Sequence, residues 1–201
     1  MMKKIVFLTL LVVSNVVIAK LNFVTTSHPG QWVLNNKAST LNFITSKNAS
    51  KTEVQTFKKL RGHIADTKVS MTVDLNSVDT GIEIRDERIR ELFFDIVHFP
   101  TAEVSITLNK SDLKFIKQGQ AKILKLDADI ELQGEVQTIP VELQIVALDK
   151  NQLLVFSRLP VIVDLKNFNL LKGVNALREI AKLQSINTTI PVTFSLLFSH
   201  Q

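Results

Sequence analysis

The charged segment at residues 85–91 is the first candidate for chemistry in this sequence. Arg85 and Asp86 are adjacent, so one interpretation makes Asp86 a general base and places the Arg85 guanidinium against an oxyanion. The alternative interpretation is structural: Asp79 or Thr80 caps a short helix, and the charges pair along it. We favour the structural interpretation and expect no catalytic residue in this segment.

Other reactive residue types are sparse or lack the spacing that chemistry needs. Ser111 and Lys114 fit the Ser-x-x-Lys pattern of acyl-transferring enzymes, but the companion motifs of those enzymes are missing. His63 and Asp66 fall within one turn, but no HExxH-like spacing supplies a metal site. The sequence has no cysteine, which excludes thiol catalysis, disulfides and zinc–thiolate sites. We therefore expect no enzyme activity, no metal and no cofactor.

Two changes of periodicity indicate which elements hold the charged segment. Residues alternate between apolar and polar over 71–75 and again over 102–108, the period of a half-buried strand. Between these ranges the apolar residues recur at near-helical spacing, and Pro100 closes the helical pattern (Ile82, Ile89, Leu92 and Phe93). The sequence thus predicts a short helical crossing between two strands.

The rest of the chain predicts a large antiparallel sheet. We expect strands at 31–34, 38–45, 69–78, 102–109, 123–132, 139–148, 153–156, 161–165 and 186–198. Residues 47–52 and 109–119 read as loops, 53–65 is ambiguous between helix and strand, and 173–183 predicts a second short helix. Eight or nine strands with one apolar face must close into a barrel or fold into a sandwich. An eight-stranded barrel is just wide enough to be filled by side chains or to hold one slender ligand.

The N-terminus resembles a secretory signal. A basic start, residues 1–4, precedes an apolar run at 5–18 and a small residue, Ala19. This run of about 14 residues is short of the roughly 20 that span a bilayer, so we favour a signal peptide cut after Ala19 over an uncleaved anchor. One mature domain, 20–201, follows. The formal charge of +5 is scattered among acidic residues, which argues against nucleic-acid binding and allows contact with an anionic membrane surface. An outer-membrane barrel would need aromatic girdles, and the chain has no tyrosine and a single tryptophan, Trp32.

Several motifs together resemble the YceI-like family over residues 32–198. The central motif combines a strand end, a charged helix and paired aromatic residues at fixed offsets. It is followed by a glycine turn and two strands (Asp79-Thr80-Gly81, Arg85-Asp86, Phe93-Phe94-Asp95, Phe99-Pro100, Gly134, Val136 to Val141 and Ile190 to Phe194). The resemblance implies an all-β fold: an extended, lipocalin-like, eight-stranded antiparallel barrel with one or two short helices. It makes Asp79, Thr80, Arg85, Asp86 and Phe94 structural motif residues.

The resemblance also implies a function, the carriage of a long-chain polyisoprenoid or of a fatty amide or acid in the barrel. It implies a periplasmic location, a transport or stress-response role and a homodimer. The alternatives are an isoprenoid-quinone or precursor carrier, an enzyme acting on such lipids, and a solid-cored interaction domain. We expect eleven apolar side chains to line the channel (Phe43, Met71, Val73, Leu75, Phe93, Val104, Ile106, Leu126, Ile130, Val192 and Phe194).

Apolar burial alone is sufficient for tight binding of such a ligand. Each buried CH₂ contributes roughly 0.8 kcal/mol, so about fifteen carbons give on the order of 12 kcal/mol. The ordering costs are several kcal/mol. Micromolar binding therefore requires no ionic anchor.

Overall fold

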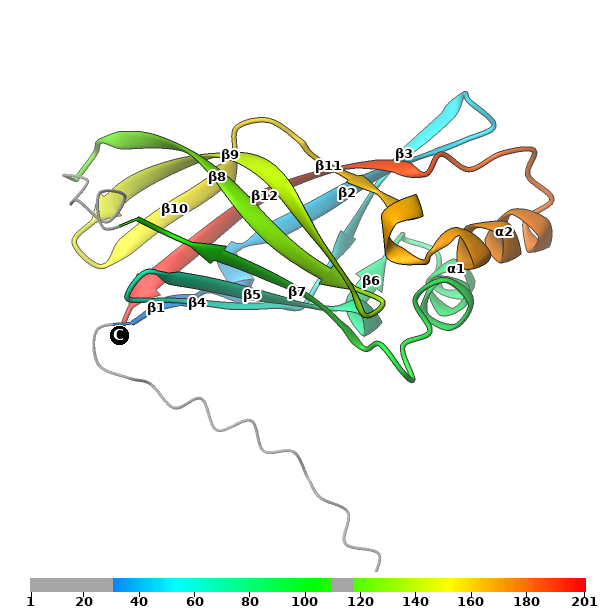
Figure 1. The fold of residues 1–201 in the computed structure, drawn as a ribbon, viewed down its shortest axis with the longest axis horizontal. Coiled ribbons are helices and arrows are strands. Elements are labelled where there is room, and N and C mark those ends of the chain that lie inside the picture. The colour runs from blue at the N-terminus through cyan, green and yellow to red at the C-terminus, as the bar shows by residue number, and fades with distance from the viewer. Residues whose placement is uncertain (1–30, 110–117) are drawn as a thin grey trace, which may run out of the picture.

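The computed structural model describes residues 31–109 and 118–201 (Figure 1). The predicted signal peptide at 1–19, the first residues of the mature domain at 20–30, and Ser111 with Lys114 lie outside the described residues. None of the helices in the described ranges combines the length and the hydropathy needed to cross a bilayer.

Within these ranges the chain forms twelve strands, three 3₁₀ turns and two helices, the first of which continues into a π-helical turn. The strands are β1 (Trp32–Leu34), β2 (Thr40–Lys47), β3 (Lys51–Phe57), β4 (Leu60–Ala65), β5 (Lys68–Asp74), β6 (Val78–Asp79), β7 (Thr101–Thr107), β8 (Ala121–Leu132), β9 (Glu135–Asp149), β10 (Gln152–Ser157), β11 (Val161–Asp164) and β12 (Thr189–His200). The helices are α1 (Glu83–Arg88), the π-helical turn η3 (Ile89–Phe94) and α2 (Leu171–Ile180), and the 3₁₀ turns are η1 (Asn36–Ala38), η2 (Leu75–Ser77) and η4 (Leu165–Phe168).

The strands close into an eight-stranded antiparallel barrel because four pairs of short strands run end to end. β12 pairs with β11 and then β10 on one flank, and with β2 and then β1 on the other. β1 continues into β2, β3 into β4, β5 into β6 and β10 into β11, so twelve strands make eight positions around the barrel. The predicted fold class is confirmed. Figure 1 shows α1 and α2 together at one end of the barrel, far from β1 and the C-terminus.

Polar residues at the breaks explain why some predicted strands are shorter than their alternation suggested. The expected strand at 69–78 is interrupted by η2, where the Asp74 carboxylate accepts a hydrogen bond from the Asn76 N–H at 3.0 Å. Asn35 and Asp164 cap η1 and η4 in the same way. A short polar side chain that bonds the backbone two residues ahead competes with the strand ladder.

The β2–β3 and β8–β9 hairpins form part of the barrel wall. The predicted loop at 47–52 was wrong in extent, because β2 and β3 stay paired as far as Lys47 and Lys51 and only 48–50 turn. The ambiguous segment at 53–65 is strand throughout, apart from the break between β3 and β4. The predicted β8–β9 hairpin is confirmed, and Gln133 and Gly134 at its turn have φ of 55° and 74°. Two left-handed residues form the type I′ turn that matches strand twist.

Candidate ligand-binding channel

Two adjacent apolar cavities occupy the inside of the barrel. A wide cavity of about 190 Å³ lies at the helical end, and a narrow cavity of about 150 Å³ lies toward the other end. Five residues line both cavities and form a waist between them (Leu41, Val104, Ile130, Val163 and Val192). Together the cavities fall at the low end of the roughly 300–1,000 Å³ typical of small-molecule sites.

The structure brings all eleven predicted channel residues to these cavities. Phe43, Val73, Leu75 and Phe93 line the wide cavity. The narrow cavity has Met71, Ile106, Leu126 and Phe194, and the remaining three lie at the waist (Val104, Ile130 and Val192). Strict alternation made this placement predictable for the nine residues on strands, since every second side chain faces the lumen, whereas Leu75 lies in η2 and Phe93 in η3. Their contact with a ligand stays a prediction.

Helical residues cover the wide cavity. Ile89, Phe93 and Phe94 reach it from η3, and Val174 and Leu177 reach it from α2. The two elements pack closely at Gly173, where a Cβ atom would lie 2.7 Å from the Cα of Phe93. Only a residue without a side chain fits this crossing, so Gly173 sets how deeply α2 sits over the cavity.

A cluster of phenylalanines forms one wall of the wide cavity. Phe43 and Phe57 stack with ring centroids 5.1 Å apart, Phe57 and Phe94 are 5.9 Å apart, and Phe93 and Phe94 are 4.7 Å apart. Phe57 was missed because its segment showed apolar residues three apart, which obscured the strand period. Phe94 was expected only to support the structure, but it also lines the cavity.

The charged motif (Asp79, Thr80, Arg85 and Asp86) holds one backbone turn at the helical end of the barrel, which we call the mouth. Asp86, only 8% exposed, accepts hydrogen bonds from the Thr80 hydroxyl and from the Thr80 N–H, the latter at 2.9 Å. Arg85 binds the same residue from the other side, with Nε donating to the Thr80 hydroxyl at 2.8 Å and Nη2 donating to its carbonyl at 2.6 Å. All four hydrogen bonds join the charged segment to its own backbone turn, and the structural role of Arg85 and Asp86 stays a prediction.

The predicted helix cap, however, was wrong. The residue before α1 is Ile82, which makes no side-chain cap. Asp79 instead accepts from the Gly81 N–H at 3.0 Å and pairs with Lys58 Nζ at 2.7 Å. The Lys58 hydrogen bond lowers the pKa of Asp79. The Asp79 side chain therefore bonds to the backbone of the turn 79–81 and not to the first turn of α1. The reason is that Gly81 (φ 74°) reverses the chain before the helix begins.

Glu53 joins the mouth to the barrel wall, a contact the sequence did not reveal. Its carboxylate accepts from Lys47 Nζ at 2.5 Å and from Arg85 Nη1 at 2.8 Å. The Lys47 hydrogen bond and the charges of Lys47, Arg85 and Lys51 lower the pKa of Glu53, against the opposing effect of burial. The charged side chains of the motif were expected to pair along their own helix, but Arg85 forms an ion pair with Glu53 on β3, 32 residues away in the sequence.

The far end of the barrel is closed by tight packing. Phe198 is 2% exposed, and Trp32 meets His200 edge to face with ring centroids 5.0 Å apart. A Cβ at Gly62 would lie 3.1 Å from the Ser70 carbonyl oxygen and 3.6 Å from the Phe198 ring. Closely packed apolar side chains thus surround the narrow cavity at this end, and Thr45 and Gln55 line the wide cavity at the helical end.

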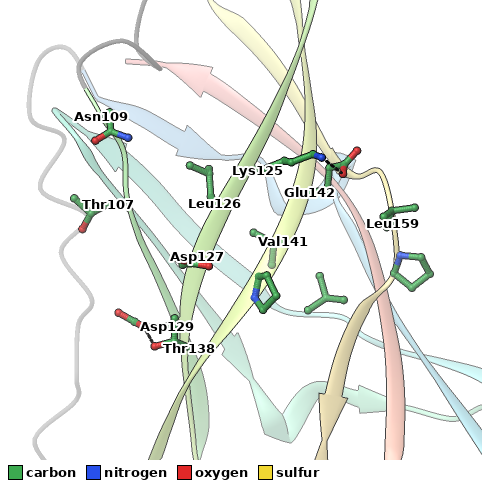
Figure 2. A pocket seen from close by; sticks show the side chains of 13 residues that line it. Thr107, Asn109, Lys125, Leu126, Asp127, Asp129, Thr138, Val141, Glu142 and Leu159 are labelled. Carbon is green, nitrogen blue, oxygen red and sulfur yellow. Dashed lines mark hydrogen bonds and ion pairs between the residues drawn. The ribbon is translucent and has the colours of Figure 1, made fainter.

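An open cleft of about 770 Å³ lies on the outside of β8 and β9 (Figure 2). It forms because β7 pairs with β8 only over 103–105, so that Thr107 and Asn109 stand across an opening from Leu126 and Asp127. The polar side chains pair with one another: Lys125 Nζ lies 3.7 Å from Glu142, and the Thr138 hydroxyl donates to Asp129 at 2.6 Å (Figure 2). Leu126, Val141 and Val161 line both this cleft and the narrow cavity.

His63 and His98 both have ordinary partners. His63 is exposed and its ring meets the Ser70 hydroxyl at 2.9 Å. His98 pairs with Asp95 at 2.9 Å on an exposed turn. Within 31–109 and 118–201, no three His, Asp or Glu side chains converge as a metal site would require.

Comparison with known proteins agrees with this architecture. A polyisoprenoid-binding domain from Saccharophagus degradans, described as implicated in plant cell wall breakdown, superposes with a TM-score of 0.82 at 28% identity, covering 87% of this chain and 100% of that chain. BcnA of Burkholderia cenocepacia gives 0.61 at 14% identity, covering 82% and 98% of the two chains. A mutant CJ YceI protein made for nanotechnology applications gives 0.54 at 13% identity, covering 73% and 84%. The last two likenesses show the fold alone.

None of the curated proteins matches the chain. A family model, the YceI-like domain, matches residues 32–198, the same range over which the sequence motifs extend. Because this match spans most of the chain, the protein belongs to the YceI-like family.

Proposed function

We propose that this protein is an exported, non-enzymatic carrier that holds a long-chain polyisoprenoid or fatty lipid in its barrel. The observation that carries the proposal is the pair of adjacent apolar cavities along the barrel axis, with polar residues at one end. The likeness to a polyisoprenoid-binding domain supports an isoprenoid ligand. The carrier removes an insoluble chain from water, and the free energy comes from burying its CH₂ groups.

The first experiment is organic extraction of the purified mature protein followed by mass spectrometry. We expect about one long-chain lipid per protein, and its mass distinguishes a polyisoprenoid, a quinone and a fatty amide or acid. An empty protein that also takes up no added lipid would refute the proposal and favour a solid-cored domain. A ligand that changes mass during incubation would favour the enzyme alternative.

A variant at the waist tests whether the lipid occupies the channel. Val104 lines both cavities, so Val104→Phe fills the connection between them. The added ring takes space that the lipid chain would occupy, so lipid retention should fall about 10-fold, or about 1.4 kcal/mol in binding free energy. Ser105→Phe is the matched control, because Ser105 is the next residue and is exposed. Equal retention by both variants would place the lipid elsewhere.

Contact with a membrane would let the carrier load. Exposed apolar side chains at the helical end support this role: Ile84 is 52% exposed, Leu171 is 41% exposed and Ile180 is 47% exposed. Flotation with anionic vesicles tests it, and loss of binding in Ile84→Ser with Ile180→Ser is the expected result. Cell fractionation and N-terminal sequencing test export and cleavage after Ala19, and light scattering tests the homodimer.

A further inference from the structure

One buried polar side chain in the channel wall has hydrogen-bonding capacity that the protein leaves unused. Gln55 is 4% exposed and lines the wide cavity. Its Nε2 donates to the Thr45 hydroxyl at 3.1 Å, but its Oε1 has no hydrogen-bond partner within residues 31–109 and 118–201. A buried polar atom without a partner is costly and rare in folded proteins.

Two other polar side chains are buried in the described part of the chain, Ser77 and Asp86, and both have partners. Ser77 donates to the Asp74 carbonyl at 2.6 Å and accepts from the Lys59 N–H at 3.0 Å. Asp86 accepts from Thr80. Both are therefore satisfied by the fold itself, whereas Gln55 needs a further partner.

Gln55 lies between the phenylalanines that line the wide cavity and the charged residues at the helical end. On β3 it lies between Phe57 and Glu53, and its register partner on β2 is Phe43. Two residues along a strand span about 6.6 Å, so the charged mouth at Glu53 is one such step away. A chain that lies among the phenylalanines would bring its end group to Gln55 before it reached the mouth.

We infer that Gln55, with Thr45, binds the polar end of the ligand, and that this end is a neutral group carrying an O–H or N–H. This inference rests on the proposed function. The amide oxygen is buried, and rotation about the terminal side-chain torsion, which is soft, turns it toward the cavity, where it accepts a hydrogen bond from such a donor. If oxygen and nitrogen are exchanged in the amide, Thr45 donates to the oxygen and the nitrogen is the atom left for the ligand.

A hydroxyl or an amide satisfies either orientation of Gln55, because each group both donates and accepts. An ester or quinone carbonyl only accepts, so it satisfies one orientation. A carboxylate would bring a charge into an apolar cavity, and the nearby cations Lys47 and Arg85 are already bound to Glu53. The channel therefore selects a neutral alcohol or amide among ligands with the same chain.

Competition between ligands with one chain and different ends tests this inference. The delipidated protein is loaded from cyclodextrin with equimolar pairs drawn from oleyl alcohol, oleamide, oleic acid and methyl oleate, and bound species are counted by native mass spectrometry. We expect the alcohol and the amide to exceed the ester about 10-fold, the effect of one buried hydrogen bond. Gln55→Met should reduce this preference to about 2-fold or less while it still binds the ester.

The matched control is Gln144→Met, because Gln144 alternates with the cavity-lining Leu143 and Ile145 on β9 and therefore faces outward. It should keep the preference of the wild type. Equal binding of all four lipids by the wild type, or an unchanged preference in Gln55→Met, would show that Gln55 does not bind the polar end of the ligand. Either result leaves the proposed lipid carriage intact. Preference for oleic acid overturns the neutral end group. Binding of none of the four by a protein that also yields no lipid on extraction overturns the proposed function itself. The wild-type ranking decides the outcome even if Gln55→Met does not fold.

Discussion

Replacement of Asp86 by alanine tests whether the charged motif is a structural clamp. The carboxylate is 8% exposed and accepts two hydrogen bonds from Thr80, while Arg85 holds the same residue from the other side. A hydrogen bond to a charged group contributes about 1.5–3 kcal/mol, and the two bonds are not additive. We expect Asp86→Ala to lower the free energy of unfolding by about 3 kcal/mol. In a domain of this size that is about 6–12 °C in Tm.

Urea unfolding followed by circular dichroism and by fluorescence is the measurement. Trp32 is the single tryptophan and lies on β1, which Figure 1 shows at the far end of the barrel from α1, so its fluorescence reports unfolding of the barrel away from the helices. Coincident transitions by both probes would show that the mouth unfolds with the barrel. Asp86→Asn keeps an acceptor for Thr80 and should lose less stability. Asp127→Ala, at an exposed position on β8, should shift the free energy of unfolding by no more than about 0.5 kcal/mol.

Two results would refute the clamp. The first is an Asp86→Ala midpoint no lower than that of Asp127→Ala. The second is an unchanged Tm together with abolished lipid binding, measured where the variant is fully folded. That second result would mean that Asp86 contacts the ligand and would revive a role for its carboxylate in binding or catalysis.

Three further predictions concern the cap, the mouth and a turn. Gly173→Ala should lower stability by about 1–2 kcal/mol in thermal melts, because the overlap with Phe93 outweighs the roughly 1 kcal/mol gain in helix propensity; a rise in Tm would contradict the close packing. Glu53 has a lowered pKa in the fold, so its stabilising contribution is present above its ordinary pKa of 4.5 and is lost as pH falls through the lower folded pKa. Glu53→Gln should therefore reduce the fall of the urea unfolding midpoint with pH below about pH 4.5. An unchanged dependence of the midpoint on pH would contradict this. Gly134→Ala should cost about 1–2 kcal/mol in urea unfolding because its φ is 74°, and a neutral effect would contradict a left-handed turn.

The barrel was predictable because strand alternation is a strong local signal. In β8 the residues Leu124, Ala128 and Leu132 are buried, as their period of two requires. The same signal placed the nine channel residues that lie on strands without any knowledge of strand order. It failed where a polar side chain bonds its own backbone, as at Asp74, because that competition depends on local geometry that an apolar pattern does not record.

The polar half of the site was harder to predict. Lys47 and Glu53 face each other only because β2 and β3 extend further than their composition suggested. Arg85 reaches Glu53 from a segment 32 residues away. Gln55 lay in the segment whose apolar residues matched a helix as well as a strand, so no face could be assigned to it. Pairings of this kind depend on tertiary register, which a single sequence does not carry.

The contrast between the mouth and Gln55 indicates which polar groups are available to a ligand. Charge density alone would place the ligand's polar end at the mouth, among Arg85, Asp86 and Glu53. Those groups are already engaged: Arg85 binds Thr80 and Glu53, Asp86 binds Thr80, and Glu53 binds Lys47. A ligand that took any of these partners would release another buried or half-buried charge, at a cost comparable to what it gained. Gln55 is the opposite case, because a ligand donor would satisfy an atom that the folded protein leaves without a partner. Unused hydrogen-bonding capacity, and not charge, therefore locates the polar end of the cargo, and the charged motif acts by holding α1 and β3 together around it.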